Sequence, residues 1–191
     1  MIIPVFGKME KAPNNTTVGL GRGASIAVKA AAASDTISGK PGESLSVWTE
    51  GCTVIFVGVG NKEKLTHKGA RDAGAKCLAK LSKDIGTEIV VRFTTGWKTA
   101  NMAAFAEGMI LRDYAFDKYQ KNDEDEQDKG EWSLECQAHD RHLEALDAAV
   151  AKSESIATGV HLARDLANEP ANRLYPDEYG RRALEWAEGK E

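Results

Sequence analysis

The run Cys52-Thr53-Val54-Ile55-Phe56-Val57-Gly58-Val59 is apolar at nearly every position. Such a run is typical of a strand that helices cover on both faces, so we expect it to lie in the centre of a sheet. The preceding segment, Leu45-Ser46-Val47-Trp48, alternates like a half-buried strand, and Glu50-Gly51 offers a tight turn between the two. The two strands are therefore predicted to form a hairpin.

Helix and strand patterns alternate after this hairpin. An amphipathic helix is expected behind a cap at Asn61, a strand rich in β-branched residues follows over 88–94, and a second long helix is predicted from Thr99 to about Tyr119. The apolar faces of the two helices are Ala70, Ala73, Cys77 and Leu81 in the first, and Met102, Phe105, Met109 and Phe116 in the second. The alternation predicts an α/β fold with a mixed β-sheet between helical layers.

Further strands and helices extend this core in both directions. Residues 1–6 are predicted to form a first strand, and a short helix is expected over 25–33. Residues 132–136, where Trp132, Leu134 and Cys136 alternate, are expected to form one more strand. A third helix is then predicted from near Asp140 to about Ala167, with one side formed by Leu143, Leu146, Val150, Ala157 and Val160.

A final helix follows a break at the end of the chain. Pro170 disfavours helical geometry at the residue before it, and Pro176 suits the first turn of a new helix. Tyr179, Ala183 and Trp186 are spaced for burial on that helix, yet no further element follows for them to pack against. This pattern suggests a chain cut off shortly after a new domain begins.

The bulk composition is that of a soluble globular protein. The chain has 191 residues, of which 42% are hydrophobic and 28% charged, and its formal net charge is −4. An acidic balance without a basic stripe makes nucleic acid an unlikely partner. No apolar run approaches the roughly 18 residues of a membrane-spanning helix, and Met1–Phe6 is too short for a signal peptide. We therefore expect a cytoplasmic protein without a membrane partner.

Cysteines and charge runs give no evidence of a reactive site. The odd set Cys52, Cys77 and Cys136 argues against a disulfide framework and predicts reduced thiols. The acidic tract 121–131 is interpreted as a solvated loop rather than a cation or partner site, because its carboxylates are contiguous in sequence.

Two short patterns resemble binding motifs but are incomplete. Gly58-Val59-Gly60 lies where a dinucleotide fold places its phosphate loop, but the third glycine and the acidic residue after the next strand are missing. We interpret it as a tight strand-to-helix turn. Cys136, His139 and His142 are unlikely zinc ligands, because they fall on different elements and lack a fourth ligand.

No other residue carries a recognisable catalytic pattern. His67 and His161 are expected in the middle of helices without a partnered nucleophile, and the chain contains no GxSxG, HExxH or Walker sequence. We therefore assign no catalytic, cofactor-binding or metal-binding residue in this chain.

Two segments resemble the leucyl (cytosol) aminopeptidase family. Residues 163–172, with the sequence ARDLANEPAN, and Pro176 shortly after resemble the family's junction between a linker helix and the catalytic domain. Residues 106–119, with the sequence AEGMILRDYAFDKY, resemble the long helix of its amino-terminal domain. Gly39-Lys40-Pro41-Gly42-Glu43 and the strand ending at Gly60 match in type and place, so the resemblance covers residues 39–191.

The resemblance implies a division of the chain into three parts. Residues 1–138 would form a macro-domain-like amino-terminal domain, 139–168 the linker helix, and 169–191 the truncated start of the catalytic domain. In the family the two divalent metal ions, zinc or manganese, and the residues that hydrolyse peptides belong to the catalytic domain. The resemblance therefore implies a non-catalytic domain that contacts its own catalytic domain and supports assembly of a hexamer and access of peptides to the active sites.

Three alternative functions remain open from the sequence. A macro-like fold could bind a nucleotide or ADP-ribose, with residues 58–60 lining the crevice. Some bacterial members of the family bind DNA, although the net charge of −4 gives this little support. The chain could also be an active peptidase through an unrecognised site.

Overall fold

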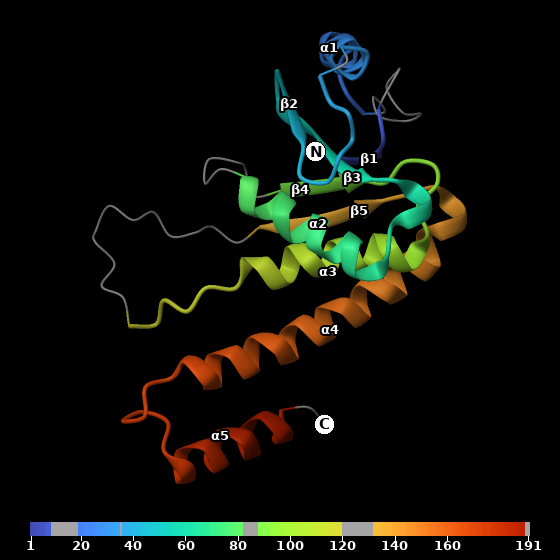
Figure 1. Ribbon diagram of the computed structural model, residues 1–191. Helices are drawn as coiled ribbons and strands as arrows, with labels where there is room; N and C mark the ends of the chain where they lie inside the picture. Colours follow the sequence, from blue (N-terminus) through green and yellow to red (C-terminus); the bar gives the residue numbers. More distant parts are fainter. Residues whose placement is uncertain (9–18, 35, 82–87, 120–131, 190–191) are drawn as a thin grey trace.

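The computed structural model describes residues 1–8, 19–34, 36–81, 88–119 and 132–189. Within these ranges the strands are β1 Ile2–Phe6, β2 Ser44–Thr49, β3 Cys52–Gly60, β4 Glu88–Arg92 and β5 Ser133–Gln137. They form one sheet in the order β2-β3-β1-β4-β5 (Figure 1). The β2–β3 pair is antiparallel, whereas β3–β1, β1–β4 and β4–β5 are parallel, so the sheet is mixed, as predicted.

The helices cover both faces of this sheet. They are α1 Arg22–Ala32, α2 His67–Lys80, α3 Thr99–Asp113, α4 Leu143–Asn168 and α5 Pro176–Glu188, with short 3-10 turns η1 Lys62–Lys64 and η2 Asp140–His142. One face of β1 and β3 packs on α1 through Val28 and Ala32, while the other packs on α2 and α3. Helix α4 lies against the outer side of α3 (Figure 1). The predicted α/β fold is confirmed.

Strand β3 is buried as its apolar sequence predicts. Val54 and Phe56 belong to the core beneath α1, whereas Ile55 and Val57 belong to the core beneath α2 and α3. The predicted hairpin with β2 is confirmed by the pairing of Thr49 with Cys52. The middle of the sheet is occupied by β1, however, and β3 lies next to it.

The predicted cap of the first long helix was wrong. Asn61 accepts a hydrogen bond from the backbone amide of Glu63 and so caps η1, whereas Thr66 accepts from the amide of Gly69 and caps α2. The expected apolar face is present, with Ala70 and Cys77 buried against α3 and the sheet.

The second long helix ends earlier than predicted. Helix α3 ends at Asp113, and Tyr114 is extended, so the predicted helical face does not reach Phe116. The cause is a set of contacts with α4 that the helical repeat cannot reveal. Tyr114 donates to Asp165 at 3.0 Å, and Arg164 donates to the carbonyl oxygen of Leu111 at 2.8 Å.

Helices α4 and α5 agree with their predicted positions, and Pro176 occupies the first turn of α5. Burial on α5 does not agree, because Tyr179 and Trp186 are 51% and 46% exposed. The described residues cover these side chains only in part, and no residue of α5 is buried. The predicted acidic loop at 121–131 lies outside the described residues.

Candidate functional site

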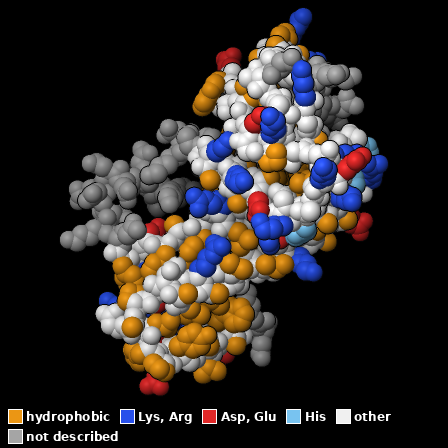
Figure 2. All heavy atoms as spheres, in the orientation of Figure 1, with side chains coloured by type: hydrophobic (Ala, Val, Ile, Leu, Met, Phe, Trp, Pro, Cys, Tyr) orange, Lys and Arg blue, Asp and Glu red, His pale blue; other side chains and the backbone are white. Residues whose placement is uncertain are grey.

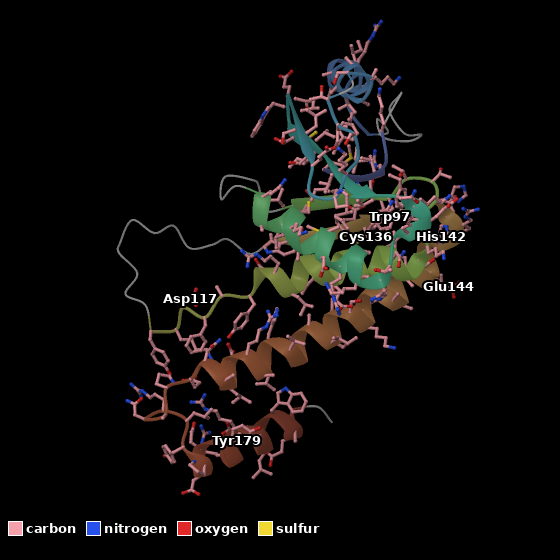
Figure 3. All side chains as sticks on the ribbon, viewed as in Figure 1. Trp97, Asp117, Cys136, His142, Glu144 and Tyr179 are labelled. Atoms are coloured by element: carbon pink, nitrogen blue, oxygen red, sulfur yellow. The ribbon has the colours of Figure 1, made fainter. Side chains whose placement is uncertain are left out.

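A pocket of about 810 Å³ opens at the carboxyl ends of β4 and β5. In α/β folds the loops that follow parallel strands lie at the same edge of the sheet, and ligands commonly bind there. The volume of this pocket falls within the range of small-molecule sites. Its lining comes from the end of β4 and the loop after it, Arg92 to Trp97, and from β5 and the residues after it, Glu135 to His139, Arg141 and His142. Met102 on α3 and Leu143 on α4 complete it. Figure 3 shows Trp97, Cys136 and His142 at the end of the sheet where α3 begins.

Basic groups dominate the wall of this pocket. Arg92, Arg141, His139 and His142 line it, whereas Glu135 is the one carboxylate among the lining residues. Burial lowers the pKa of the Arg92 guanidinium, and the nearby Glu135 carboxylate opposes that shift. Arg92 also donates from Nε to the side-chain oxygen of Gln137 at 2.8 Å. The wall therefore offers mainly hydrogen-bond donors and positive charge.

A further cation lies beside the loop that follows β4. Gly96 has a φ of +106°, and a Cβ built there would lie 2.8 Å from Nζ of Lys62. Glycine at this position therefore leaves space for the lysine ammonium against a loop that lines the pocket.

Trp97 anchors the inner end of the pocket. The residue is 3% exposed, and its ring packs against Phe6, Phe93 and Phe105 with centroid distances of 5.0, 5.0 and 6.0 Å. Its indole Nε1 is buried and donates to no acceptor in the described part of the chain. An unpaired buried donor of this kind costs about 1–3 kcal/mol, so its retention calls for an explanation.

Cys136, His139 and His142 are brought to this pocket, but not as metal ligands. Nε2 of His142 accepts from Nε of Arg141 at 3.1 Å, so its Nδ1 carries the proton and donates to Oγ1 of Thr99 at 2.9 Å. Burial raises the pKa of the Cys136 thiol to about 12. Within the described ranges no group of three or more His, Cys, Asp or Glu side chains could hold a metal ion.

The Gly58-Val59-Gly60 segment is filled by the protein itself. A Cβ at Gly58 would lie 2.3 Å from the carbonyl oxygen of Lys40, and the amide of Gly60 donates to the carbonyl oxygen of Gly39 at 2.8 Å. Backbone from residues 39–41 therefore occupies the space that a phosphate would need. The predicted tight strand-to-helix turn was wrong in its place, because Gly58 and Gly60 lie within strand β3 and the short η1 follows before α2 begins.

The two other histidines occupy structural positions. His67 is the first residue of α2, not a mid-helix residue as expected, and it is exposed. His161 does lie within α4, where its ring packs on Tyr114 at 5.3 Å between centroids. Neither histidine lines the pocket.

A second candidate surface lies on α5. Large apolar side chains are exposed there, and Figure 2 shows hydrophobic atoms gathered over α5 at the lower end of the molecule. These side chains are Tyr175, Tyr179, Leu184 and Trp186, which are between 46% and 66% exposed. We call these four residues the α5 apolar face. At about 100° per residue, Tyr179 and Trp186 lie on one side of α5 and Leu184 on the opposite side, so apolar side chains are exposed around much of the helix. Exposed apolar side chains of this size are typical of protein contacts.

An ionic junction holds α5 beside the end of α4. Glu169, between the two helices, receives hydrogen bonds from Tyr119 and from Arg182 at 3.0 Å, and Lys118 lies 3.6 Å from the same carboxylate. The hydrogen bonds from Tyr119 and Arg182 hold the pKa of Glu169 below its usual range. We call Lys118, Tyr119, Glu169 and Arg182 the Glu169 junction. It links α5, which carries Tyr179 (Figure 3), to the end of α4 and to the segment after α3.

Sequence reasoning found some of these residues and missed others. It singled out Cys136, His139 and His142, which do meet at one pocket, but it did not single out Arg92, Trp97 or Arg141. The available signal was the loop of residues 94–98 between a buried strand and a helix. For α5, Tyr179 and Trp186 were recognised as a pair on one side of the helix, but they were expected to be buried and are exposed.

No helix among the described residues has both the length and the apolar sequence needed to cross a membrane. This finding agrees with the absence of a long apolar run in the sequence.

Comparison with known proteins connects the chain to one family. The model of the N-terminal domain of the cytosol aminopeptidase family matches residues 2–123. A probable cytosol aminopeptidase of Rhizobium etli (strain CFN 42) is 36% identical over 134 residues, which are 69% of this chain and 27% of that protein. One of Rhodopseudomonas palustris (strain CGA009) is 34% identical over 171 residues, which are 85% of this chain and 34% of that protein.

Solved structures share the fold at low sequence identity. A mutant of tomato leucine aminopeptidase aligns with a TM-score of 0.72 and 20% identity, covering 98% of this chain and 39% of that chain. The bottromycin maturation enzyme BotP aligns with a TM-score of 0.66 and 20% identity, covering 98% of this chain and 37% of that chain. The chain therefore spans about a quarter to two fifths of the length of these proteins.

Proposed function

Because this chain belongs to the cytosol aminopeptidase family, in which it matches the N-terminal domain, we propose that it is the non-catalytic domain of a two-metal leucyl aminopeptidase. In this proposal the complete enzyme removes amino-terminal residues from peptides in the cytoplasm. The N-terminal domain supports hexamer assembly and shapes access to the active sites. The match over residues 2–123 is the observation that carries the proposal.

The described residues favour an accessory role over a catalytic one. Two-metal hydrolysis needs carboxylates that converge from rigid elements to hold two cations a few ångströms apart. The ranges that the structure describes contain no such group, so the residues present do not fit two metal ions. We therefore assign the zinc or manganese ions, and the hydrolytic step, to a catalytic domain and derive no step from this chain.

Residues 169–191 are predicted to begin the catalytic domain, so we propose that the α5 apolar face packs against the remainder of that domain. Leu184 and Tyr179 are 66% and 51% exposed, and the Glu169 junction fixes the helix that carries them. The curated relatives are three to four times longer than the segment that this chain matches, so the family supplies a large domain to cover such a face. Burial of these side chains would contribute apolar contact area to the interface.

A chimera tests both assembly and docking. The segment of the Rhodopseudomonas palustris protein that this chain matches is replaced by this chain, and the product is measured for mass by light scattering and for hydrolysis of leucine-p-nitroanilide with manganese. We expect a hexamer with activity. Leu184→Glu and Tyr179→Glu in the chimera are expected to reduce the hexamer fraction and the activity about tenfold, because a charge would be buried at the contact.

The matched control is Ile26→Glu, which alters an exposed apolar side chain, 61% exposed, on α1 at the other end of the fold. It is expected to change neither readout. Equal effects of the three substitutions, or none, would contradict docking through α5. A relative that lacks this whole region, yet remains hexameric with unchanged peptide preference, would contradict the role in assembly and access.

The 191-residue chain on its own provides a separate test. The 191-residue protein is incubated with leucine-p-nitroanilide and manganese, with and without a chelator. We expect no metal-dependent hydrolysis, so the two rates should be equal. Chelator-sensitive turnover would instead show that the described fold carries its own peptidase site. The ADP-ribose and DNA alternatives are not favoured, since residues 39–41 fill the space at Gly58 and the net charge is −4.

A further inference from the structure

Strand β2, Ser44–Thr49, forms one edge of the sheet, and within the described ranges no strand pairs with its outer side (Figure 1). An edge strand presents unpaired backbone N–H and C=O groups, and proteins usually protect such an edge with charged residues, proline or a bulge. Strand β2 has the sequence SLSVWT, which contains no charged residue and no proline, and its register with β3 is continuous. The edge is therefore open to another strand.

Alternate residues of β2 direct their backbone groups to this open edge. The carbonyl oxygen of Glu43 accepts a hydrogen bond from the amide of Gly58 at 2.9 Å, so the backbone of Glu43 faces β3. Because backbone groups alternate along a strand, the odd-numbered residues of β2 also face β3. The outward residues are Ser44, Ser46 and Trp48, and all three are exposed. Each of them offers an N–H and a C=O group along the edge.

The same outward residues place their side chains on the α2 side of the sheet. Leu45 packs in the core beneath α1, so the side chains of its neighbours point to the opposite face. On that face Trp48 is 74% exposed. Lys80, in the last turn of α2, donates to the carbonyl oxygen of Gly42, and its Nζ lies 3.5 Å from Oγ of Ser44. The open edge therefore has an exposed indole near one end and an ammonium group near the other.

The outward backbone groups match a second copy of β2 that runs antiparallel. When Ser46 lies opposite Ser46 of the second copy, Trp48 lies opposite Ser44, and each outward N–H and C=O group finds a partner. The arrangement has two-fold symmetry, so the same residues serve both copies. A shift of this register by two residues would place Ser44 or Trp48 opposite a residue outside β2, so the centred register is preferred.

The side chains favour the same register. It places Trp48 beside the Lys80 ammonium of the second copy, because Lys80 lies next to Ser44, and a cation is attracted to the face of an aromatic ring. Glu50, exposed at the tip of the hairpin, comes opposite Gly42, whose carbonyl oxygen receives the same ammonium. The opposite charges of Glu50 and Lys80 therefore meet once on each side of the two-fold axis.

From the unprotected edge and these self-complementary groups, we propose that β2 pairs antiparallel with β2 of a second copy of this chain, centred on Ser46. The pairing joins two five-stranded sheets into one continuous sheet. It does not depend on docking through α5, because β2 and α5 lie at opposite ends of the fold (Figure 1). Two copies joined in this way leave both α5 apolar faces available for other contacts.

Sedimentation of the 191-residue chain over a range of concentrations tests the pairing. The contact is small, so we expect a reversible dimer with a dissociation constant on the order of 10–100 μM. Ser46→Pro removes an outward N–H but no hydrogen bond to β3, and edge strands tolerate proline, so the fold is retained. This variant is expected to weaken the dimer by about tenfold or more. Ser46→Ala keeps the N–H group and is expected to leave the dissociation constant unchanged. Thermal denaturation establishes that both variants are folded.

Side-chain variants test the contacts beside the edge. Trp48→Ser removes the exposed ring and is expected to weaken the dimer about tenfold. Ile26→Ser, the matched control, alters a side chain on α1 that is 61% exposed, and it is expected to leave the dimer unchanged. Glu50→Lys brings like charges together and is expected to weaken the dimer. Adding Lys80→Glu to Glu50→Lys restores opposite charges and is expected to recover part of the loss.

A disulfide cross-link tests the register. Residues that exchange both hydrogen bonds in an antiparallel pair have Cα atoms about 5.5 Å apart, a distance that a disulfide spans. Ser46→Cys is made in a chain where Cys52→Ser removes the half-buried thiol of β3, and it is expected to form a disulfide-linked dimer under mild oxidation. Ser44→Cys in the same background is the control. Its two copies lie about 13 Å apart along the strands, so it is expected to cross-link far more slowly.

Several results would overturn the proposal. A chain that stays monomeric up to millimolar concentration excludes the pairing, and so do equal effects of Ser46→Pro and Ser46→Ala. Equal cross-linking rates of Ser44→Cys and Ser46→Cys would indicate random collision. A dimer that Leu184→Glu dissociates and Ser46→Pro does not would show that the copies associate through α5 instead. Failure of the β2 pairing would leave the chimera test of α5 docking unaffected.

Discussion

Gly74 on α2 lies so close to Phe105 on α3 that a Cβ at Gly74 would be 2.0 Å from the Phe105 carbonyl oxygen. The contact is reciprocal, since a Cβ at Gly108 on α3 would lie 1.9 Å from the carbonyl oxygen of Arg71 on α2. The two helices therefore touch through their backbones, and side chains larger than hydrogen are excluded at both positions.

Gly74→Ala and Gly108→Ala are expected to destabilise the fold by about 1–3 kcal/mol or more, because the added methyl group forces the helices apart. Chemical denaturation measures the change. The control is Gly159→Ala on α4, where nothing lies within 4 Å of the added carbon. That variant is expected to be stabilised by up to about 1 kcal/mol through helix propensity. Destabilisation by Gly159→Ala equal to that of the other two would contradict the contact.

The ion pair between Arg71 and Glu107 crosses the same helix contact. The two side chains are 3.0 Å apart, and the Glu107 side chain is 6% exposed while that of Arg71 is 41% exposed. Arg71→Met removes the partner and leaves the carboxylate in a buried place, so we expect a loss of about 1–3 kcal/mol in unfolding free energy. Glu107→Gln should cost less, because the amide keeps a hydrogen-bond acceptor without a charge.

The control for this pair is Lys68→Met, which removes the partner of Asp72 on the exposed side of α2. An exposed ion pair contributes about 0–1 kcal/mol, so little change is expected. If Arg71→Met and Lys68→Met had equal effects, the burial of Glu107 would not be the cause.

The attachment of α5 is expected to depend on pH. Hydrogen bonds from Arg181 and Arg182 lower the pKa of Glu178 from 4.5 to about 2, and those from Tyr119 and Arg182 lower the pKa of Glu169. A carboxylate with a lowered pKa stabilises the folded state above its unfolded pKa, and that contribution is lost as the pH falls through the folded pKa. Loss of the Glu178 pairs, which lie within α5, should therefore weaken the helix itself between about pH 4.5 and pH 2, whereas protonation of Glu169 at acidic pH should weaken the attachment to α4.

Glu169→Gln tests this dependence because it removes the charge that links the two helices. Helix content from circular dichroism is expected to fall between pH 4.5 and 2 in the unaltered chain and to be lower already at pH 6 in the variant. Glu188→Gln, at the exposed end of α5, is the control and should follow the unaltered chain. Identical curves of helix content against pH for all three proteins would show that the Glu169 charge does not stabilise α5.

Two of the three cysteines are expected to resist thiol reagents. Burial raises the pKa values of Cys77 and Cys136 to about 12, so at pH 8 both thiols remain protonated and should react slowly. A chromogenic disulfide should titrate at most one thiol, Cys52, in the folded protein and three in guanidinium chloride. Cys136→Ser should leave the folded count unchanged. Rapid reaction of two or more thiols in the folded protein would contradict the protection of Cys77 and Cys136.

The elements that the sequence predicted well are those with a local cause. Strand β3 is apolar throughout because it is covered on both faces, and Pro176 begins α5 because its ring suits a first helical turn. The end of α3 has a distant cause. Tyr114 leaves the helix to reach Asp165, which is 51 residues away, and no helical repeat encodes that contact.

The same distinction between local and distant causes explains which residues of the pocket the sequence could predict. Cys136, His139 and His142 were recognisable as a cluster because they are close in sequence, but Arg92 and Trp97 join them only through the parallel pairing of β4 with β5. Arg92 pairs with Gln137 in that register, 45 residues later. A site assembled by strand pairing cannot be identified until the order of the strands is known.

The length of α4 has a consequence for where α5 is presented. At 26 residues and about 1.5 Å per residue, α4 is a rod of about 39 Å that carries the Glu169 junction away from the sheet. Each residue inserted into or removed from its exposed half would turn α5 by about 100° around that rod. The directions in which Tyr179 and Leu184 project therefore depend on the number of residues in α4, in addition to the contacts that α5 makes.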